Sequence, residues 1–360
     1  MSESQTLPDE ISRELRAVIA EAGITQNASL IERMLVTALG LGSDQTNKLD
    51  LKIASSALTE MRAAFSLFAP FADVPKVTIF GSARTQPTDV AYKQAKRVAA
   101  ALAERGWMVV TGAGPGIMQA AAEGAGPDLS LGVSIRLPFE EKPNATIDVG
   151  RNVAMKYFFT RKLMLVKESS GFVYVPGGFG TLDELFELLT LQQTGKSEPT
   201  PVVLLDEPGG DFWRSFRDFM DDHLGRAGVI SPDDFGRMRL TDSVSTAAEE
   251  ITGFWRNYDS LRWVGDRLVL RLRAEPSDDE VAGLNERFAG LLAHGTIHKR
   301  GPLQHEIHDG DRLELPRLVC RFDPFQVGSL YRLIGAINEL PSAPKTLAVP
   351  PSVGRPSDLE

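Results

Sequence analysis

Apolar residues recur at helical spacing through the first seventy residues of the chain. They lie three or four positions apart within Ile11–Ile19, Ile31–Ala38 and Leu49–Phe68, and the last run ends before Pro70. This spacing places apolar side chains on one face of an α-helix, so the pattern predicts three helices. Three short helices rarely fold alone, and we expect this segment to pack on the following domain or on a second subunit.

Beyond Lys76 the pattern changes to short β-branched runs that alternate with helical stretches. Helical spacing is found over Tyr92–Arg105, Gly116–Gly124, Asn152–Lys167 and Leu182–Gln193. Strands separated by amphipathic helices form a mostly parallel sheet that is covered on both faces. We therefore predict a Rossmann-like α/β domain with strands at VTIF, WMVVTG, LGVSIRL, GFVYVP and PVVLL.

Beyond Trp263 the pattern predicts a strand, a helix, a hairpin around His298–Ile307, a further strand and a last helix. This succession is typical of a small α+β domain of ferredoxin-like type. The residues from Pro341 are rich in Pro and Ser and are expected to be disordered. The chain is thus predicted to contain a helical N-terminal extension (1–74), the Rossmann-like domain (75–258), the ferredoxin-like domain (259–342) and a disordered tail (343–360).

Charge and cysteine content narrow the classes of function. The net charge is −9 and the pI is near 5.3, which argues against a nucleic-acid surface because such a surface needs a basic stripe. The single cysteine, Cys320, allows no internal disulfide. The first thirty residues contain no apolar block of signal length, and no later run has the roughly 18 apolar residues of a membrane span. We expect a cytoplasmic protein with no membrane partner.

Glycine clusters follow three of the predicted strands. They include Gly81-Ser82, Gly112–Gly116 and Pro176–Thr181. Open parallel sheets bind ligands at the carboxyl ends of their strands, and glycines there expose backbone N–H groups that favour an anion such as phosphate. Each cluster alone is equally consistent with a tight turn, but three on one sheet favour a phosphate site.

Two common nucleotide motifs are not present. The second cluster has the pattern G-x-G-x-G, and not the G-x-G-x-x-G of dinucleotide-binding proteins. About 20 residues further on, where an acid should hold the adenosine ribose, the chain has Gly132–Ile135. The sequence also lacks G-x-x-x-x-G-K-[ST]. NAD and ordinary NTPase chemistry are therefore not expected.

The third cluster is the most specific. Its glycines allow a tight turn, Thr181 can contact a phosphate oxygen, and Glu184 lies in what we expect to be the first helical turn, beside the ligand. Thr181-x-x-Glu184 also satisfies the capping-box pattern. The spacing alone leaves a catalytic carboxylate and a capping carboxylate as alternatives.

The run PGGFGTLDE resembles the signature P-G-G-x-G-T-x-x-E of the LONELY GUY (LOG) family, formerly labelled lysine decarboxylases. Arg161-Lys162, fifteen residues before Pro176, matches the Arg-Lys pair of the family. Gly112–Met118 resembles its G-G-G-x-x-G-L-M turn, although Ala113 and Pro115 depart from it. The resemblance covers roughly residues 75–255. Members of this family are phosphoribohydrolases that act on cytokinin riboside monophosphates or on ordinary nucleoside monophosphates.

The resemblance implies roles for individual residues. Arg161 and Glu184 would be the catalytic pair, and the enzyme would release free base and ribose 5-phosphate without a cofactor. Like its relatives, the protein is expected to form a homodimer or a higher homo-oligomer. Tyr157–Thr160 replaces a Met-His-x stretch before the arginine, which leaves the preferred base open. The residues expected to contact substrate or phosphate are Gly81, Ser82, Gly114, Gly116, Lys162, Gly177, Gly178, Gly180 and Thr181.

The sequence gives less support to a decarboxylase, to a metal site or to a protein that binds nucleotides without catalysis. A decarboxylase would need pyridoxal phosphate on an activated lysine, and no lysine has an identifying context. The C-terminal histidines and Cys320 match no zinc spacing, so no metal is assigned. The alternative to an enzyme is a nucleotide-binding sensor or carrier with the same pocket.

Overall fold

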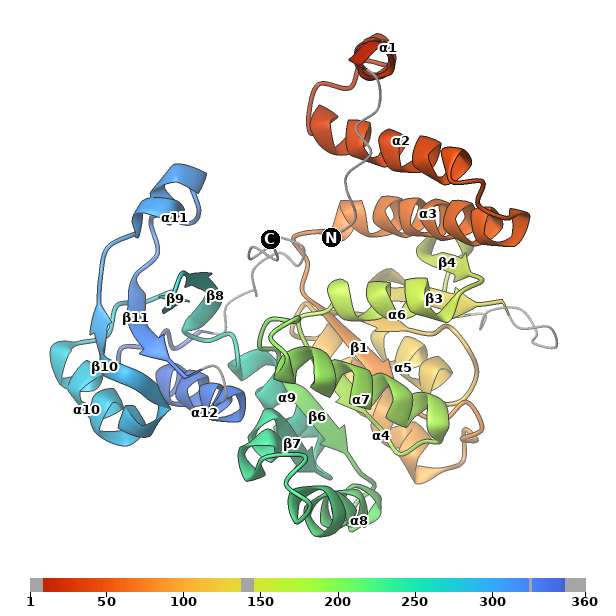
Figure 1. Ribbon diagram of the computed structural model, residues 1–360. Helices are drawn as coiled ribbons and strands as arrows, with labels where there is room; N and C mark the ends of the chain where they lie inside the picture. Colours follow the sequence, from red (N-terminus) through yellow and green to blue (C-terminus); the bar gives the residue numbers. More distant parts are fainter. Residues whose placement is uncertain (1–8, 137–145, 324–325, 347–360) are drawn as a thin grey trace. The chain divides into compact units, whose positions relative to one another are not determined.

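The computed structural model describes residues 9–136, 146–323 and 326–346. The chain divides into two compact units after residue 61, and each is described by itself. The first unit contains α1 (Asp9–Glu21), α2 (Ala28–Ser43) and most of α3 (Lys48–Phe68), which confirm the three predicted helices (Figure 1). The surface that covers their apolar faces stays a prediction. The expected disordered tail lies outside the described residues from position 347 on.

A seven-stranded parallel sheet forms the centre of the second unit (Figure 1). Its order is β4-β3-β2-β1-β5-β6-β7 and every pairing is parallel, which confirms the predicted fold class. The chain winds outward from β1 to β4 and then returns to place β5 on the other side of β1. The carboxyl ends of β1 and β5 are therefore the switch point at which such sheets bind ligands. The strands are β1 (Lys76–Phe80), β2 (Met108–Thr111), β3 (Ser130–Ile135), β4 (Asn152–Met155), β5 (Phe172–Tyr174), β6 (Val202–Leu205) and β7 (Met238–Thr241).

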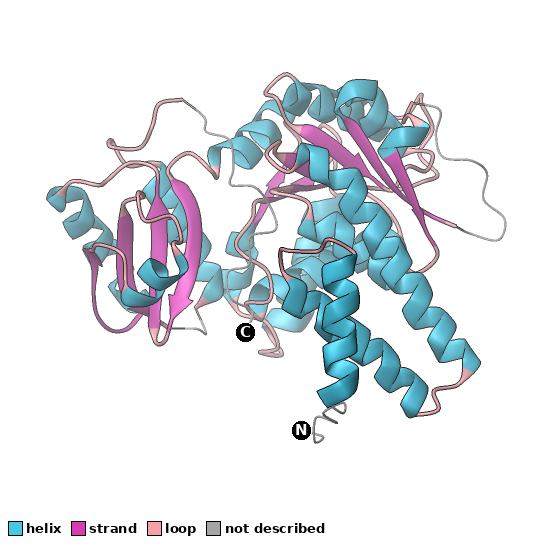
Figure 2. Ribbon diagram, turned by 90° about the horizontal axis from the view of Figure 1, so that it is seen from above, coloured by secondary structure: helices cyan, strands magenta, loops and turns pink. Residues whose placement is uncertain are grey.

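Helices cover both faces of this sheet (Figure 2). On one face, Val77 and Ile79 of β1 belong to the same core cluster as residues of α4 (Val90–Ala103), α5 (Ile117–Ala125) and α9 (Val244–Gly253). On the other face, the Thr78 hydroxyl donates to the Leu165 carbonyl of α6. Because successive side chains of a strand point to opposite faces of the sheet, β1 contacts one helical layer through Val77 and Ile79 and the other through Thr78. The second layer contains α6 (Phe158–Lys167) and α7 (Phe179–Gln193), and α8 (Phe212–Phe219) follows β6.

A four-stranded antiparallel sheet follows, in the order β10-β11-β9-β8. Its core face packs on α10 (Asp278–Phe288) and α12 (Val327–Asn338). The predicted hairpin turn at His298–Ile307 is wrong in detail, because the connection between β10 and β11 contains α11 (Gln304–Asp309) and extends to Arg317. The strands are β8 (Tyr258–Val264), β9 (Arg267–Leu272), β10 (Leu292–Lys299) and β11 (Arg317–Phe322).

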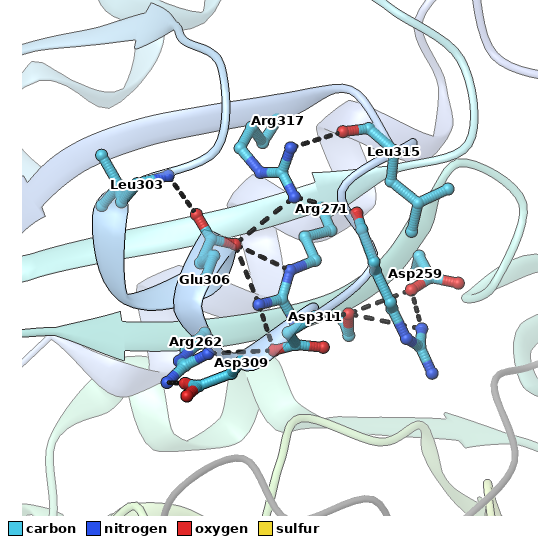
Figure 3. Close-up of polar contacts among 11 residues, drawn as sticks. Asp259, Arg262, Arg271, Leu303, Glu306, Asp309, Asp311, Leu315 and Arg317 are labelled. Carbon is cyan, nitrogen blue, oxygen red and sulfur yellow. Dashed lines mark hydrogen bonds and ion pairs between the residues drawn. The ribbon is translucent and has the colours of Figure 1, made fainter.

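The other face of this small sheet carries a network of buried ion pairs (Figure 3). Glu306 of α11 is fully buried and accepts hydrogen bonds from Nε and Nη2 of Arg271, at 3.1 and 2.9 Å. Its Oε1 also lies 3.4 Å from Nη2 of Arg317, and Asp311 lies 2.6 Å from Arg271. Arginines of the strands thereby fix the 304–311 segment over the sheet.

The two sheets share one hydrophobic core. A single cluster contains Trp255, which follows α9, and Leu333 and Ile337 of α12. The Asn338 side chain accepts hydrogen bonds from the backbone N–H groups of Asn257 and Tyr258, at 2.8 and 2.9 Å. The second sheet is therefore attached to the first through buried contacts.

Candidate functional site

Three glycine-rich turns meet at the carboxyl ends of β1, β2 and β5. β1 pairs with both β2 and β5, so the turns that follow these strands are neighbours. The N–H of Ile117 in the second turn donates to the Ser82 carbonyl in the first, at 3.0 Å. After β5, the N–H of Val175 donates to the Phe80 carbonyl, at 2.9 Å. The structure thus brings together the clusters expected to bind phosphate.

Two glycines are required by these contacts. Gly116 has a φ of 68°, and a Cβ at this position would lie 2.3 Å from the Ser82 carbonyl oxygen. A Cβ on Gly177 would lie 2.2 Å from the Thr181 hydroxyl oxygen and 3.0 Å from the Ser82 backbone nitrogen. Any larger residue would push the turns apart.

Gly178 and Gly180 differ from these two. Neither has a positive φ, and a Cβ at either position would meet nothing within 4 Å. The described part of the protein therefore gives no steric reason for glycine here. They border the N-terminus of α7, where the first helical amides have no intrahelical acceptor. Open space beside free amides is what a bound anion requires.

The helix α7 begins earlier than the sequence predicts. Gly178 is its N-cap residue, without a side-chain capping bond, so Thr181 is the third helical residue and Glu184 lies in the second turn. The expected place of Glu184 in the first turn is wrong. The capping-box alternative is wrong for the same reason, because Thr181 does not cap the helix.

Glu184 is buried, with 6% of its surface exposed. Its Oε2 is enclosed and has no hydrogen-bond partner among the described residues. Burial raises the pKa of this carboxyl to about 7, against the opposing effect of the Lys162 and Arg161 charges. The Tyr174 hydroxyl donates to the Glu184 carbonyl at 3.2 Å and holds the backbone here. A buried carboxyl without a partner next to a cluster of charges is characteristic of a functional site.

Arg161 projects from α6 toward the second turn. Its Nε donates to the Val133 carbonyl of β3 at 2.9 Å. A Cβ on Gly112 would lie 2.0 Å from Nη2 of this arginine, so Gly112 makes room for the guanidinium. Sequence reasoning did not include Gly112 among the site residues. The signal in the sequence was that Gly112 directly follows a predicted strand and precedes Ala113. Its contact with Arg161 joins two distant parts of the chain, so no local pattern shows it.

Lys162 is held between two acids of α7. Its Nζ lies 2.8 Å from Asp183 and 2.6 Å from Glu187. These acids were also missed in the sequence, although they flank Glu184 and lie four residues apart on one helical face. The structure thus places Lys162 close to Glu184 and in ion pairs with its neighbours.

The remaining predicted contacts lie in the first two turns. A Cβ on Gly81 would clash with the Ile117 side chain at 2.6 Å, and one on Gly114 would lie 2.7 Å from Met118 Cε. The Ser82 hydroxyl accepts a hydrogen bond from the Arg84 N–H at 3.1 Å, as in a tight turn. Packing alone accounts for these observations, and their contact with a ligand stays a prediction.

Among the described residues, no group of three or more His, Cys, Asp or Glu side chains is arranged to hold a metal ion. Over the same residues, the helices are all too short or too polar to cross a bilayer.

A parallel sheet with glycine-rich turns at its switch point and a buried carboxyl beside them defines an α/β protein of Rossmann-like type. Residues 115–251 match the family model "Possible lysine decarboxylase". The cytokinin riboside 5′-monophosphate phosphoribohydrolase of Mycobacterium tuberculosis is 32% identical over 157 residues, which cover 42% of this chain and 81% of that protein. That of Mycobacterium marinum is 30% identical over 156 residues, with coverage of 42% and 80%.

The chain therefore belongs to the LOG family. The LOG1 enzyme of Arabidopsis thaliana is 38% identical over 84 residues, 23% of this chain and 38% of that protein. Among solved structures, the molybdenum cofactor binding protein of Rippkaea orientalis aligns with 49% of this chain and 94% of its own, at 22% identity and a TM-score of 0.34. A likeness at that level bears neither on mechanism nor on substrate.

Proposed function

We propose that this protein hydrolyses the N-glycosidic bond of a nucleoside 5′-monophosphate and releases free base and ribose 5-phosphate. The observation that carries the proposal is the buried Glu184, whose Oε2 has no partner among the described residues and which lies on the helix that begins at the phosphate turn. The named activity of the mycobacterial relatives supports it.

The phosphate end is proposed to lie at the N-terminus of α7. There the amides of Phe179 and Gly180 have no intrahelical acceptor, and the helix dipole favours a negative charge. Gly178 and Gly180 leave open space for the phosphate oxygens. Thr181 would add a hydroxyl donor, and the Gly116 and Gly177 turns would shape the site with Gly81, Ser82 and Gly114.

The chemistry follows from the charge distribution. Breaking the bond between C1′ and the base nitrogen gives the ribose an oxocarbenium character that a nearby carboxylate stabilises. Water then bonds to C1′, the electron pair of the broken bond stays on the base, and Glu184 accepts a proton from the water. A proton is finally delivered to the base, so one water is consumed for each bond broken. No cofactor is needed.

Arg161 is proposed as the second catalytic residue. Its guanidinium keeps its charge at all accessible pH values and can hold an anionic oxygen or the departing base. The hydrogen bond from Nε to the Val133 carbonyl fixes the direction of the side chain. Gly112 leaves space for Nη2 at the end of β2.

The alternative function is a nucleotide sensor or carrier that binds the same ligands without turnover. A pure binding site has no need of a buried carboxyl without a partner, and Glu184 therefore favours catalysis. A cytoplasmic location and a homodimer or higher homo-oligomer belong to the same proposal.

A substrate panel tests the proposed function. Purified protein would be incubated with AMP, GMP, CMP, UMP and isopentenyladenosine monophosphate, and free base would be measured by chromatography. We expect base release from at least one nucleotide and its loss in Glu184→Gln, which keeps the shape of the side chain but not its charge. Tight binding without base release from any of the five would favour the sensor or carrier.

A further inference from the structure

Lys162 connects the helix that carries Arg161 to the helix that carries Glu184. Its side chain is only 14% exposed, and Nζ forms ion pairs with Asp183 at 2.8 Å and with Glu187 at 2.6 Å. The two acids lie on either side of Glu184 along α7. The ammonium is therefore fixed at two points beside the carboxyl.

This geometry does not suit a phosphate ligand. An ammonium has three N–H donors, and two carboxylates already take up its charge. A phosphate would have to displace one of these acids or bind next to both of them. Because like charges repel, the carboxylates of Asp183 and Glu187 would weaken the binding of a phosphate to the Lys162 ammonium.

We propose that Lys162 is a positioning residue that acts through Glu184: held by Asp183 and Glu187, its ammonium favours the charged form of the Glu184 carboxyl, which accepts a proton from water. This inference rests on the proposed function, and it assigns Lys162 to the carboxylate end of the site and not to the phosphate.

The charged and titratable groups around Glu184 come from three elements. Lys162 and Arg161 of α6 lower the pKa of its carboxyl, whereas Glu187 and Asp183 of α7 raise it. Burial is the largest influence and raises the pKa to about 7. From β5, the Tyr174 hydroxyl donates to the Glu184 backbone carbonyl, and burial, with the charges of Glu184 and Glu187, raises the pKa of this phenol. The Lys162 charge thus opposes both burial and the two acids that hold it.

The expected pH effect has a definite sign. If the carboxylate is the active form, the rate rises with pH through the pKa of Glu184. Removing the Lys162 charge raises this pKa, and it also leaves Asp183 and Glu187 without their cation, which raises the pKa further. Compared with the unchanged protein, the variant should therefore lose activity at neutral pH and recover it at higher pH.

Four variants test this inference against the pH profile of kcat/KM. In Lys162→Met we expect the midpoint of the acid limb to move to higher pH by about one unit or more. Lys162→Arg keeps the charge and should restore the wild-type midpoint. Glu187→Gln removes an acid and should move the midpoint the other way, to lower pH. Lys167→Met removes a lysine of the same helix that pairs with Glu168, and should leave the midpoint in place.

A second measurement makes the result independent of turnover. The Glu184 carboxyl would be titrated by NMR in protein labelled with ¹³C at the glutamate carboxyl carbons, with Glu184→Gln to assign the signal. The same shifts are expected in the same variants. If no nucleotide is hydrolysed, the proposed function fails, but this titration still tests whether Lys162 controls the charge of Glu184.

One result with Lys162→Met would overturn the inference. If Lys162→Met raises KM for the nucleotide and leaves both midpoints unchanged, Lys162 is a phosphate ligand and the inference is overturned. If the variant fails to fold by circular dichroism, the opposite shift expected in Glu187→Gln decides. An unchanged midpoint in Glu187→Gln would then count against the inference.

Discussion

Glycines within one turn serve different purposes at the scale of single residues. Gly177 faces the Thr181 side chain, so the fold itself excludes a Cβ there. Gly180 faces open space in the second position of α7, where an alanine would favour the helix. The described residues give no packing reason for glycine at this second position, and we propose that a bound phosphate requires it. The fold therefore requires glycine at position 177, whereas the proposed phosphate requires it at position 180.

This difference predicts the behaviour of two matched variants. Gly180→Ala should leave the melting temperature unchanged or raise it slightly, while KM for the preferred nucleotide rises about tenfold, or about 1.4 kcal/mol of binding energy. Gly177→Ala should lower the stability by about 1–3 kcal/mol, because the turn must shift. Thermal unfolding and steady-state kinetics on both proteins would check this. A normal KM in Gly180→Ala would place the phosphate elsewhere.

At the scale of elements, the small antiparallel sheet depends on charge to hold its outer segment. Glu306 is fully buried between Arg271 and Arg317, which are themselves only 4% and 1% exposed in their side chains. Charges removed from water in this way need each other, because an arginine left without its acid has lost hydration without gaining a partner. The free energy of unfolding should therefore fall most clearly when one member of the network is removed.

Glu306→Gln should lower the free energy of unfolding by about 3 kcal/mol, since it leaves strand arginines under-compensated. The matched control is Asp266→Asn, which breaks an exposed pair with Arg321 that solvent screens, and it should change the free energy of unfolding much less. Urea denaturation followed by circular dichroism would measure both. Equal effects of the two changes would show that the buried network does not stabilise the sheet.

The elements that could be predicted from sequence are those with a strong local signal. The helices of the N-terminal segment, five strands of the parallel sheet and the glycine turns after β1, β2 and β5 follow from spacing and from glycine. The helix predicted over Asn152–Lys167 is wrong in its first part, because Asn152–Met155 forms β4 and α6 begins at Phe158, and β7 was not predicted. β8 was missed because its run of Tyr258–Val264 mixes apolar residues with Asp259 and Arg262, whose partners come from the distant segment at 309–312. The roles of Gly112 and Asp183 were missed for the same reason. Contacts that depend on the third dimension leave no local pattern.

At the scale of the whole molecule, the two sheets of the second unit are joined by buried groups. Asn338 of α12 satisfies two backbone N–H groups where the chain enters the second sheet, and it donates to the Phe254 carbonyl at 2.6 Å. The Tyr331 hydroxyl accepts a hydrogen bond from the Thr200 N–H before β6. Because the hydrophobic core is also continuous, neither sheet can unfold without exposing apolar surface of the other.

This continuity predicts cooperative unfolding. Hydrogen exchange measured across a urea series should show peptides of β5 and β9 losing protection at the same denaturant concentration. In Asn338→Ala, buried N–H groups lose their acceptor, and we expect β9 to open at lower urea than β5. Asn285→Ala is the matched control, since Asn285 bonds only within the small sheet's own elements in the contacts described, to Val281 and Ile297. Separate opening of the two sheets in the wild type would mean that the shared core does not couple them, and that the C-terminal sheet behaves as an independent domain.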